Sequence, residues 1–306
     1  MRIFRELDDI PTEARGASAA IGNFDGVHLG HQYVLDHARR DGAPLAVVTF
    51  APHPREVFAP DAPPFRLMSR EARASRLQKL GVELLFELPF ARIAPLTADA
   101  FAEDVLARAL GLSHVVTGAD FRFGKGRAGD VETLRNAGRR MGFEVTTVPL
   151  LGGDPPVSST AIRQALSEGR PRDAAAMLGH WHRIEGPVIH GEKRGRTLGY
   201  PTANMSMDGL HLPRLGVYAV LVDIAEGPHR GTHRGVASLG VRPMFGENAP
   251  NLETFLFDFS GDLYSTTLSV ALVEFLRPEM RFDGLEPLIA QMDADSARAR
   301  AILADG

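Results

Sequence analysis

Two histidines near the start of the chain have the type and spacing for chemistry on a phosphate. His28 and His31 occur in the segment IGNFDGVHLGH, residues 21–31, which follows a predicted strand and opens a predicted helix. Residues three apart share one face of a helix, and the first helical turn favours anions through its unpaired N–H groups and its dipole. Two imidazoles there could stabilise charge on a phosphate undergoing displacement. The alternatives are a helix-cap or packing role, or a zinc site whose third ligand the sequence does not name.

The same segment is suited to bring backbone close to a phosphate. Glycines at positions 22, 26 and 30 lack the Cβ that would hold a phosphate at a distance. We therefore predict a phosphate-binding loop that includes Gly22, Asn23, Phe24, Asp25 and Gly30.

Two more polar segments follow predicted strands in this half of the chain. His53 lies just beyond a strand end in VTFAPHPRE, residues 48–56, and GADFRFGKGRAGD, residues 118–130, follows another strand. Because ligands bind parallel sheets at the carboxyl ends of their strands, we expect both segments on the sheet edge that carries the histidine pair. In the second segment Phe121 and Phe123, close to Asp120, either hold a flat polar ring or anchor a loop.

A further segment, VSSTAIR, residues 157–163, combines hydroxyl groups with an arginine at a predicted helix start. Ser158 or Ser159 can serve as the N-cap, and Arg163 falls in the first turns. Hydroxyls, free N–H groups and a guanidinium together would make a second anion clamp. A plain N-cap explains the serines but not the arginine.

The C-terminal half contains a basic, glycine-rich loop within GPVIHGEKRGRTLGYPTAN, residues 186–204. The GxxxxGK[ST] pattern of a P-loop is absent from the sequence. A flexible basic loop is nevertheless suited to phosphates, and a simple surface turn is the alternative. The predicted phosphate-binding residues are Gly191, Lys193, Gly195 and Arg196.

Three polar residues follow this loop and complete a second candidate site. Thr202 and Asn204 are two apart, so in extended backbone their side chains point the same way and offer two oxygens to a magnesium ion. Glu253 alternates in phase with the three phenylalanines that follow it in NLETFLFDFSGDLY, residues 251–264. Partial burial on an aromatic face would suit this carboxylate to act as a general base. A carboxylate paired with an arginine at a barrel mouth is the alternative.

Strand and helix patterns alternate through the first 150 residues. Strands buried on both faces read as continuous apolar runs, and strand–helix alternation favours a doubly wound parallel α/β sheet. The expected strands are residues 17–22, 44–50, 82–88, 114–117 and 143–149, and the expected helices are residues 29–41, 69–80, 97–110 and 131–141.

Two expected helices after residue 158 close the first domain or link it to the second, and from residue 183 the pattern changes. Several short strands in series, separated by glycine-containing turns, favour an antiparallel β-barrel or sandwich. The expected helices are residues 158–168, 171–179 and 284–303, and the expected strands are residues 216–224, 234–239, 252–259 and 266–276.

Composition excludes several classes of protein. The 306 residues include 34 basic and 38 acidic side chains, a formal net charge of −4, which disfavours a basic nucleic-acid binder. The chain has no cysteine, so disulfides, thiolate nucleophiles and cysteine-ligated metal sites are ruled out. With neither a signal-peptide pattern nor a long apolar stretch, we expect a cytoplasmic protein that binds neither nucleic acid nor membrane.

Together these segments resemble the prokaryotic bifunctional riboflavin kinase/FAD synthetases, in family order and over nearly the whole chain. GNFDGVHLGH is similar to the nucleotidyltransferase HxGH motif, and TFAPHP, GADFRFGKGRAGD and SSTAIR resemble other adenylyltransferase segments. GRTLGYPTAN resembles the kinase motif, and LETFLFDFSGDLY the strand that carries the kinase base. The resemblance implies a nucleotidyltransferase-type domain over residues 1–180 and a riboflavin kinase β-barrel with a C-terminal helix over residues 181–306.

The resemblance also implies two reactions. The C-terminal domain would move the γ-phosphate of ATP to the riboflavin 5′-hydroxyl, with Glu253 as base and with Thr202 and Asn204 on Mg²⁺. The N-terminal domain would then transfer AMP to FMN, giving FAD and pyrophosphate, while His28 and His31 stabilise the transferring group. The implied ATP-binding residues further include Ser159, Thr160 and Arg163, and the implied flavin-binding residues are His53, Asp120, Phe121 and Phe123.

Four places depart from the family pattern. Met244 stands where threonine is usual, residues 180–182 (His-Trp-His) where Arg-Pro-Tyr is usual, Ser265 where glycine is common, and Asp120 where asparagine is common. The first two concern contacts of the kinase domain and packing of the linker, so a monofunctional FMN adenylyltransferase with a weak or silent kinase is one alternative. A flavin-binding regulatory protein is another. The expected partners are riboflavin, FMN and ATP, with a weak homo-oligomer allowed for.

Overall fold

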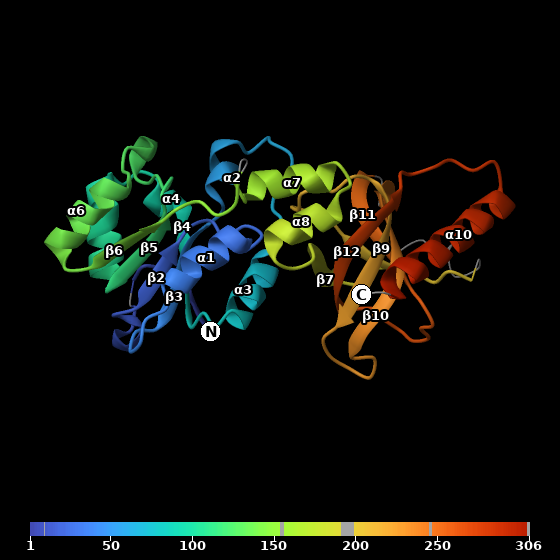
Figure 1. The fold of residues 1–306 in the computed structure, drawn as a ribbon, viewed down its shortest axis with the longest axis horizontal. Coiled ribbons are helices and arrows are strands. Elements are labelled where there is room, and N and C mark those ends of the chain that lie inside the picture. The colour runs from blue at the N-terminus through green and yellow to red at the C-terminus, as the bar shows by residue number, and fades with distance from the viewer. Residues whose placement is uncertain (9, 154–155, 191–198, 245–246, 305–306) are drawn as a thin grey trace. The chain divides into compact units, whose positions relative to one another are not determined.

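The computed structural model describes the chain except for residues 9, 154–155, 191–198, 245–246 and 305–306. The chain divides into two compact units (Figure 1). The first unit comprises Met1–Ala62 and Arg70–Ser158, and the second comprises Pro63–Ser69 and Ser159–Gly306. The domain boundary at residue 180 stays a prediction, because both helices expected before it fall in the second unit by this division.

Six parallel strands form the sheet of the first unit, in the order β1-β4-β3-β2-β5-β6. The predicted doubly wound sheet and its five strands are confirmed, and β1 is a short addition. The order reverses around β2, and ligands of such sheets bind at this switch point, beyond the carboxyl ends of the strands. The strands are β1 (Arg2–Phe4), β2 (Ser18–Ile21), β3 (Leu45–Ala51), β4 (Leu84–Pro89), β5 (His114–Gly118) and β6 (Glu144–Val148).

The four expected helices of this unit are present, two of them with differences. The helix expected over residues 29–41 ends at His37. There the backbone changes to hydrogen bonds between residues three apart, from Ala38 N–H to the Leu35 carbonyl and from Arg39 N–H to the Asp36 carbonyl. The helix expected over residues 97–110 has π-helical pitch from Phe101 onward. The helices are η1 (Thr12–Ala14), α1 (Leu29–His37), α2 (Pro54–Phe58), α3 (Arg70–Lys79), α4 (Phe90–Ile93), α5 (Ala98–Ala100), η2 (Phe101–Ala109), η3 (Lys125–Arg127) and α6 (Val131–Met141). The structure thus adds the short helices η1, α2, α4 and η3 to the expected ones.

The opposite, amino edge of this sheet carries a buried histidine with a structural role. His114 Nδ1 lies 2.8 Å from Ser18 Oγ, and its Nε2 lies 2.9 Å from Thr146 Oγ1. Burial lowers the pKa of His114 to about 4. A neutral ring with both nitrogens paired therefore ties together β2, β5 and β6 at the edge away from the candidate site.

Six antiparallel strands form the sheet of the second unit, in the order β7-β12-β9-β10-β11-β8. Just after β7, Ile189 N–H bonds to the carbonyl of Asn204 in β8, 2.9 Å away, so the two edges approach closure. The predicted antiparallel barrel is confirmed. Its strands are β7 (Arg183–Pro187), β8 (Ala203–Ser206), β9 (Gly216–Ile224), β10 (Gly231–Met244), β11 (Glu247–Leu256) and β12 (Thr267–Arg277).

Among its described residues, the second unit also contains the helices α7 (Ser159–Ser167), α8 (Pro171–Leu178) and α10 (Leu285–Ala304). The C-terminal helix is fixed to the sheet by Arg277, whose Nη2 lies 2.8 Å from Asp295 Oδ2, both side chains being largely buried. Its Ala299 and Leu303 share an apolar cluster with Trp181, one of the residues that depart from the family pattern. Trp181 therefore contributes to packing in the barrel unit.

Candidate active sites

The histidine pair lies at the N-terminus of α1, as predicted. His28 is the N-cap residue, and its Nδ1 accepts a hydrogen bond from the backbone N–H of His31, 3.3 Å away. The two rings stack, with centroids 3.6 Å apart and planes 20° apart. Because the cap bond occupies Nδ1 of His28, a ligand would meet this ring at Nε2. The cap role and the substrate-contact role are therefore compatible at His28.

His31 is held in its neutral form. Burial of the ring lowers the pKa of His31 well below its usual range, and the charges of His28 and Arg73 lower it further. The Nδ1 atom of His31 is buried and has no hydrogen-bond partner in the described part of the chain. A neutral imidazole can donate a hydrogen bond to a phosphate oxygen. A buried nitrogen without a partner is costly, and such a nitrogen fits a site that a ligand completes.

The turn between β2 and α1 is strained. The φ angle is +51° at Phe24, +86° at Gly26 and +44° at Val27, and only glycine adopts this region readily. The side chains of Phe24 and Val27 are fully buried, and the Phe24 ring packs 4.9 Å from the His31 ring. Strained backbone held by surrounding packing is typical of ligand-binding loops. Since its ring is buried, Phe24 would meet a phosphate through its backbone.

The other predicted loop residues have distinct settings. A Cβ on Gly30 would lie 3.1 Å from Nδ1 and Cε1 of His28, closer than side chains normally pack, so glycine lets the His28 ring lie over the helix start. A Cβ on Gly22 would lie 3.4 Å from the Phe24 ring. Asn23 is exposed, whereas Asp25 is buried. These residues and the histidines form one continuous turn at the carboxyl end of β2.

His53 follows β3 and has a structural partner. It is the N-cap of α2, where its Nδ1 accepts a hydrogen bond from Arg55 N–H at 3.0 Å. Glu56 completes the capping box, because its Oε2 accepts a hydrogen bond from His53 N–H at 2.9 Å. His53 thus starts a short helix at the carboxyl end of β3, and its contact with flavin stays a prediction.

The two phenylalanines after β5 differ in exposure. Phe123 is 6% exposed, belongs to the core of the first unit and pairs with Gly129 through two backbone hydrogen bonds. Phe121 is partly exposed and stacks on Phe123, with centroids 5.5 Å apart and planes 14° apart. Asp120 is exposed beside them. Phe123 anchors the loop, and Phe121 is the ring with surface available to a flat ligand.

The serine–arginine segment opens α7 in the second unit. Ser159 begins the helix, Thr160 is exposed, and Arg163 lies one turn on. Arg163 Nε donates a hydrogen bond to the carbonyl of Phe65, 2.6 Å away, and its guanidinium lies 5.2 Å from the centre of the Phe65 ring. This contact explains the presence of an arginine structurally, and the phosphate-binding role of the three residues stays a prediction.

In the barrel, the structure brings together three of the predicted kinase residues. Thr202 directly precedes β8, and Asn204 lies within it. The antiparallel register places Asn204 opposite Glu253 on β11. Directly opposed residues of a sheet share a face and lie within contact distance. The predicted loop residues Gly191, Lys193, Gly195 and Arg196 lie outside the described residues.

A buried asparagine that the sequence analysis missed fixes the amide of Asn204. Asn251 Nδ2 donates a hydrogen bond to Asn204 Oδ1 at 2.8 Å, and both side chains are buried. Asn251 Oδ1 is buried and has no partner among the described residues. Amide and hydroxyl oxygens are ligands that hard divalent cations accept. The residues present therefore fit a divalent cation beside Asn204.

The aromatic alternation proposed for Glu253 is only partly correct. Strand β11 ends at Leu256, so Phe257 and Phe259 lie beyond it. The chain turns there through Asp258, which has a φ of +54°. Leu252 and Leu256 point into the barrel interior. Glu253 and Phe255 lie on the opposite, outer face of the strand. Glu253 is partly buried on that face.

The zinc alternative for the histidine pair requires a third ligand. Among the residues that the structure describes, no group of three or more His, Asp or Glu side chains could hold a metal ion. Three further polar residues were not predicted from the sequence: Thr49, Arg73 and Glu87. Thr49 and Arg73 contact the backbone of the histidine turn, and Glu87 contacts Arg73. A signal was present, since Glu87 interrupts the apolar strand LLFELP.

Comparison with known proteins gives matches over both units. The family model described as FAD synthetase matches residues 10–161, and the model described as riboflavin kinase matches residues 178–303. Two curated relatives are named bifunctional riboflavin kinase/FMN adenylyltransferase. The protein of Pseudomonas fluorescens is 42% identical over 99% of this chain and 98% of its own length. That of Escherichia coli K12 is 39% identical over 98% of this chain and 96% of its own length.

A solved structure also matches nearly the whole chain. A crystal structure from Streptococcus pneumoniae, titled as a macrolide-efflux protein, has a TM-score of 0.82 at 33% identity and covers 96% of both chains. Within the part of this chain that the structure describes, no helix is long and apolar enough to cross a membrane. The family resemblance seen in the sequence is confirmed by the two models and the relatives. The chain belongs to the family of bifunctional riboflavin kinase/FMN adenylyltransferases and carries both the FAD synthetase and the riboflavin kinase domain.

Proposed function

We propose that the two reactions of this family take place at the two sites described above. FMN adenylation is assigned to the turn that carries His28 and His31, and riboflavin phosphorylation to the sheet face that carries Asn204 and Glu253. The observation that carries the second assignment is the cross-strand pairing of Asn204 with Glu253. The stacked histidines at the N-terminus of α1 support the first.

Adenylyl transfer would be a direct displacement. An oxygen of the FMN phosphate attacks the α-phosphorus of ATP, the bond to the β-phosphate oxygen breaks, and pyrophosphate leaves. His28 and the neutral His31 donate hydrogen bonds to the α-phosphate, where negative charge increases. The helix N-terminus binds the remaining phosphates. Residues proposed to hold ATP phosphates are Gly22, Asn23, Phe24, Asp25, Gly30, Ser159, Thr160 and Arg163, and those proposed to hold the flavin are His53, Asp120, Phe121 and Phe123.

Riboflavin phosphorylation would depend on a base and on charge neutralisation. Glu253 takes the proton of the riboflavin 5′-hydroxyl as that oxygen attacks the γ-phosphorus of ATP. The bond from the γ-phosphorus to the β-phosphate oxygen breaks, and ADP leaves. A divalent cation, which we propose to be Mg²⁺, would be held by the side chains of Thr202 and Asn204 and would neutralise phosphate charge when bound. The basic loop would contact the phosphates through Gly191, Lys193, Gly195 and Arg196.

The setting of the enzyme is proposed as well. We infer a cytoplasmic protein whose partners are riboflavin, FMN and ATP, without nucleic acid or membrane and at most weakly self-associating. The domain boundary is placed near residue 180. The absence of a basic surplus supports the exclusion of nucleic acid, since the formal net charge is −4.

Chromatography of flavins tests the proposal directly. Purified protein is incubated with ATP and Mg²⁺, starting from riboflavin in one reaction and from FMN in another. FMN followed by FAD from riboflavin is the expected result. FAD from added FMN alone would support the monofunctional alternative, with Met244 as the first residue to revert. Tight flavin binding without either product would support the regulatory alternative.

A further inference from the structure

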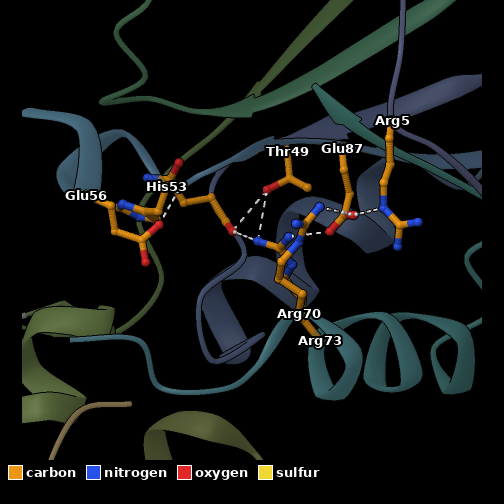
Figure 2. Close-up of polar contacts among 8 residues, drawn as sticks. Arg5, Thr49, His53, Glu56, Arg70, Arg73 and Glu87 are labelled. Carbon is orange, nitrogen blue, oxygen red and sulfur yellow. Dashed lines mark hydrogen bonds and ion pairs between the residues drawn. The ribbon is translucent and has the colours of Figure 1, made fainter. Parts of the chain in front are cut away.

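A buried carboxylate lies behind the histidine turn, outside the residues assigned so far. Glu87 on β4 is 2% exposed and is surrounded by three arginines (Figure 2). Its Oε1 lies 2.7 Å from Arg73 Nη2, and its Oε2 lies 2.8 Å from Arg70 Nη2 and 3.1 Å from Arg5 Nε. Burial alone would raise the pKa of Glu87, but hydrogen bonds from Arg70 and Arg73 bring it below its ordinary value. Glu87 is therefore ionised at neutral pH.

The three arginines are not equivalent. The side chains of Arg5 and Arg70 are 62% and 40% exposed, whereas that of Arg73 is 4% exposed. Burying a guanidinium is costly unless its donors are paired. Arg5 and Arg70 alone would already neutralise the charge of the Glu87 carboxylate. The burial of Arg73 therefore calls for a further role.

Arg73 also reaches the histidine turn. While Nη2 bonds to Glu87, Nη1 donates a hydrogen bond to the backbone carbonyl of Asn23 at 3.2 Å. Thr49 Oγ1 on β3 donates to the same carbonyl at 3.1 Å, and Arg73 Nη1 lies 3.4 Å from that hydroxyl. Figure 2 shows Arg73 and Thr49 converging in this way, with Glu87 on the other side of the guanidinium.

The carbonyl of Asn23 is a sensitive point of the turn. It precedes the positive φ angles of Phe24, Gly26 and Val27, which carry the chain to His28. Backbone in these regions persists only where its surroundings over-determine it. Two side-chain donors on one carbonyl, Arg73 from α3 and Thr49 from β3, supply such a constraint.

We propose that Arg73, oriented by Glu87, is a positioning residue for adenylyl transfer, because it fixes the Asn23 carbonyl and with it the turn that presents His28 and His31. This inference rests on the proposed roles of the two histidines. The planar guanidinium is needed, because two separate nitrogens donate hydrogen bonds to the Glu87 carboxylate and to the Asn23 carbonyl. A lysine has one ammonium group and cannot reproduce this geometry.

The test compares two arginines that share the same carboxylate. Arg73→Met and Arg70→Met are assayed for conversion of FMN to FAD, with kcat and KM for ATP determined separately. Misplacement of reacting groups by about 1 Å can cost roughly 100-fold in rate, so R73M should lower kcat about 10- to 100-fold and R70M less than about twofold. Phosphorylation of riboflavin by the same samples should be unchanged. R73K should restore little of the loss.

The pH profile separates positioning from mere stability. The charge of Arg73 contributes to the low pKa of His31, whereas Arg70 is not among its causes. The acidic limb of kcat against pH for FAD formation should therefore move to higher pH in R73M and stay in place in R70M. Equal losses in the two variants, or a folded R73M with normal kcat, would overturn the proposal.

A second variant covers the case in which R73M does not fold. Thr49→Val removes the other hydrogen bond to Asn23 and keeps the ion pair with Glu87. It should lower kcat for FAD formation about threefold to tenfold, and a normal kcat would again overturn the proposal. His28→Ala is assayed in parallel. If H28A keeps its FAD synthesis, the proposed function fails. If H28A loses it and the Arg73 and Thr49 variants do not, only the positioning role fails.

Discussion

The two candidate sites hold their polar groups by different means. In the first unit, His28 and His31 depend on an irregular turn with positive φ angles at Phe24 and Val27. In the second unit, Asn204 and Glu253 face each other in a regular antiparallel ladder. The turn needs many partners to hold it, whereas the ladder is fixed by backbone hydrogen bonds. Activity at the first site should therefore respond to backbone changes, and activity at the second mainly to the side chains themselves.

The largest effect is expected at the ladder site, the site of Asn204 and Glu253 in the second unit. Glu253→Gln keeps the shape of the side chain and removes the base, so FMN formation should fall about 10²- to 10⁴-fold. Conversion of FMN to FAD should be normal, because Glu253 is not among the residues proposed for that reaction. Both rates are read from one chromatographic assay with two starting flavins. Undiminished phosphorylation would remove Glu253 as the base.

The corresponding change at the turn is His28→Ala. Loss of one donor to a charged transition state typically costs about 10²- to 10³-fold in kcat, so FAD formation should fall by this factor. FMN formation serves as the internal control and should be retained. A parallel fall in both reactions would mean that the sites are not independent.

A backbone-level change sharpens the contrast between the sites. Gly30→Ala places a Cβ 3.1 Å from the His28 ring, which must shift. FAD formation should fall about tenfold, on the scale of a small misplacement of a reacting group. Alanine favours a helix over glycine by about 1 kcal/mol, so the melting temperature should not fall. Gly153→Ala is the control and should have no effect, because its Cβ would meet no described atom within 4 Å outside its chain neighbours.

The smallest effect is expected for a side chain one step removed from the ladder site. Asn251→Ala removes the hydrogen bond that fixes the amide of Asn204. Such a bond contributes about 1 kcal/mol, or roughly a fivefold change in a binding constant. The Mg²⁺ concentration needed for half-maximal FMN formation should rise by about this factor, with FAD formation from FMN as control. An unchanged Mg²⁺ dependence would assign Asn251 a packing role only.

Local signals account for what could be predicted from the sequence. Helix α6 begins and ends where expected because Asp130 caps its start, accepting from Thr133 N–H, and Gly142 adopts the left-handed conformation at its end. His28 and His31 were recognised because an apolar strand, glycines and a helix start lie together in the sequence. Strands β7 (RIEGP) and β8 (ANMS) were not predicted because neither has a continuous apolar run, and β1 has only three residues.

Pairings between distant segments could not be predicted. The opposition of Asn204 and Glu253 depends on the register of β8 against β11, which no local pattern specifies. The contact of Arg73 with Asn23 likewise depends on how α3 packs beside the turn. Phe121 and Phe123 look equivalent in the sequence, but Phe123 is buried and Phe121 is partly exposed.

The assignment of Pro63–Ser69 to the second unit has a consequence for how the gene could be divided. The chain passes between the units three times, since this segment lies between two parts of the first unit. Leu67 is 1% exposed and is buried among Ile162, Ala165 and Leu166 of α7. A gene split after codon 158 would leave Leu67 on one polypeptide and its partners on the other. Fission at that point would therefore require compensating changes in this segment, whereas fission near codon 180, the boundary proposed above, would keep Leu67 and its α7 partners on one polypeptide.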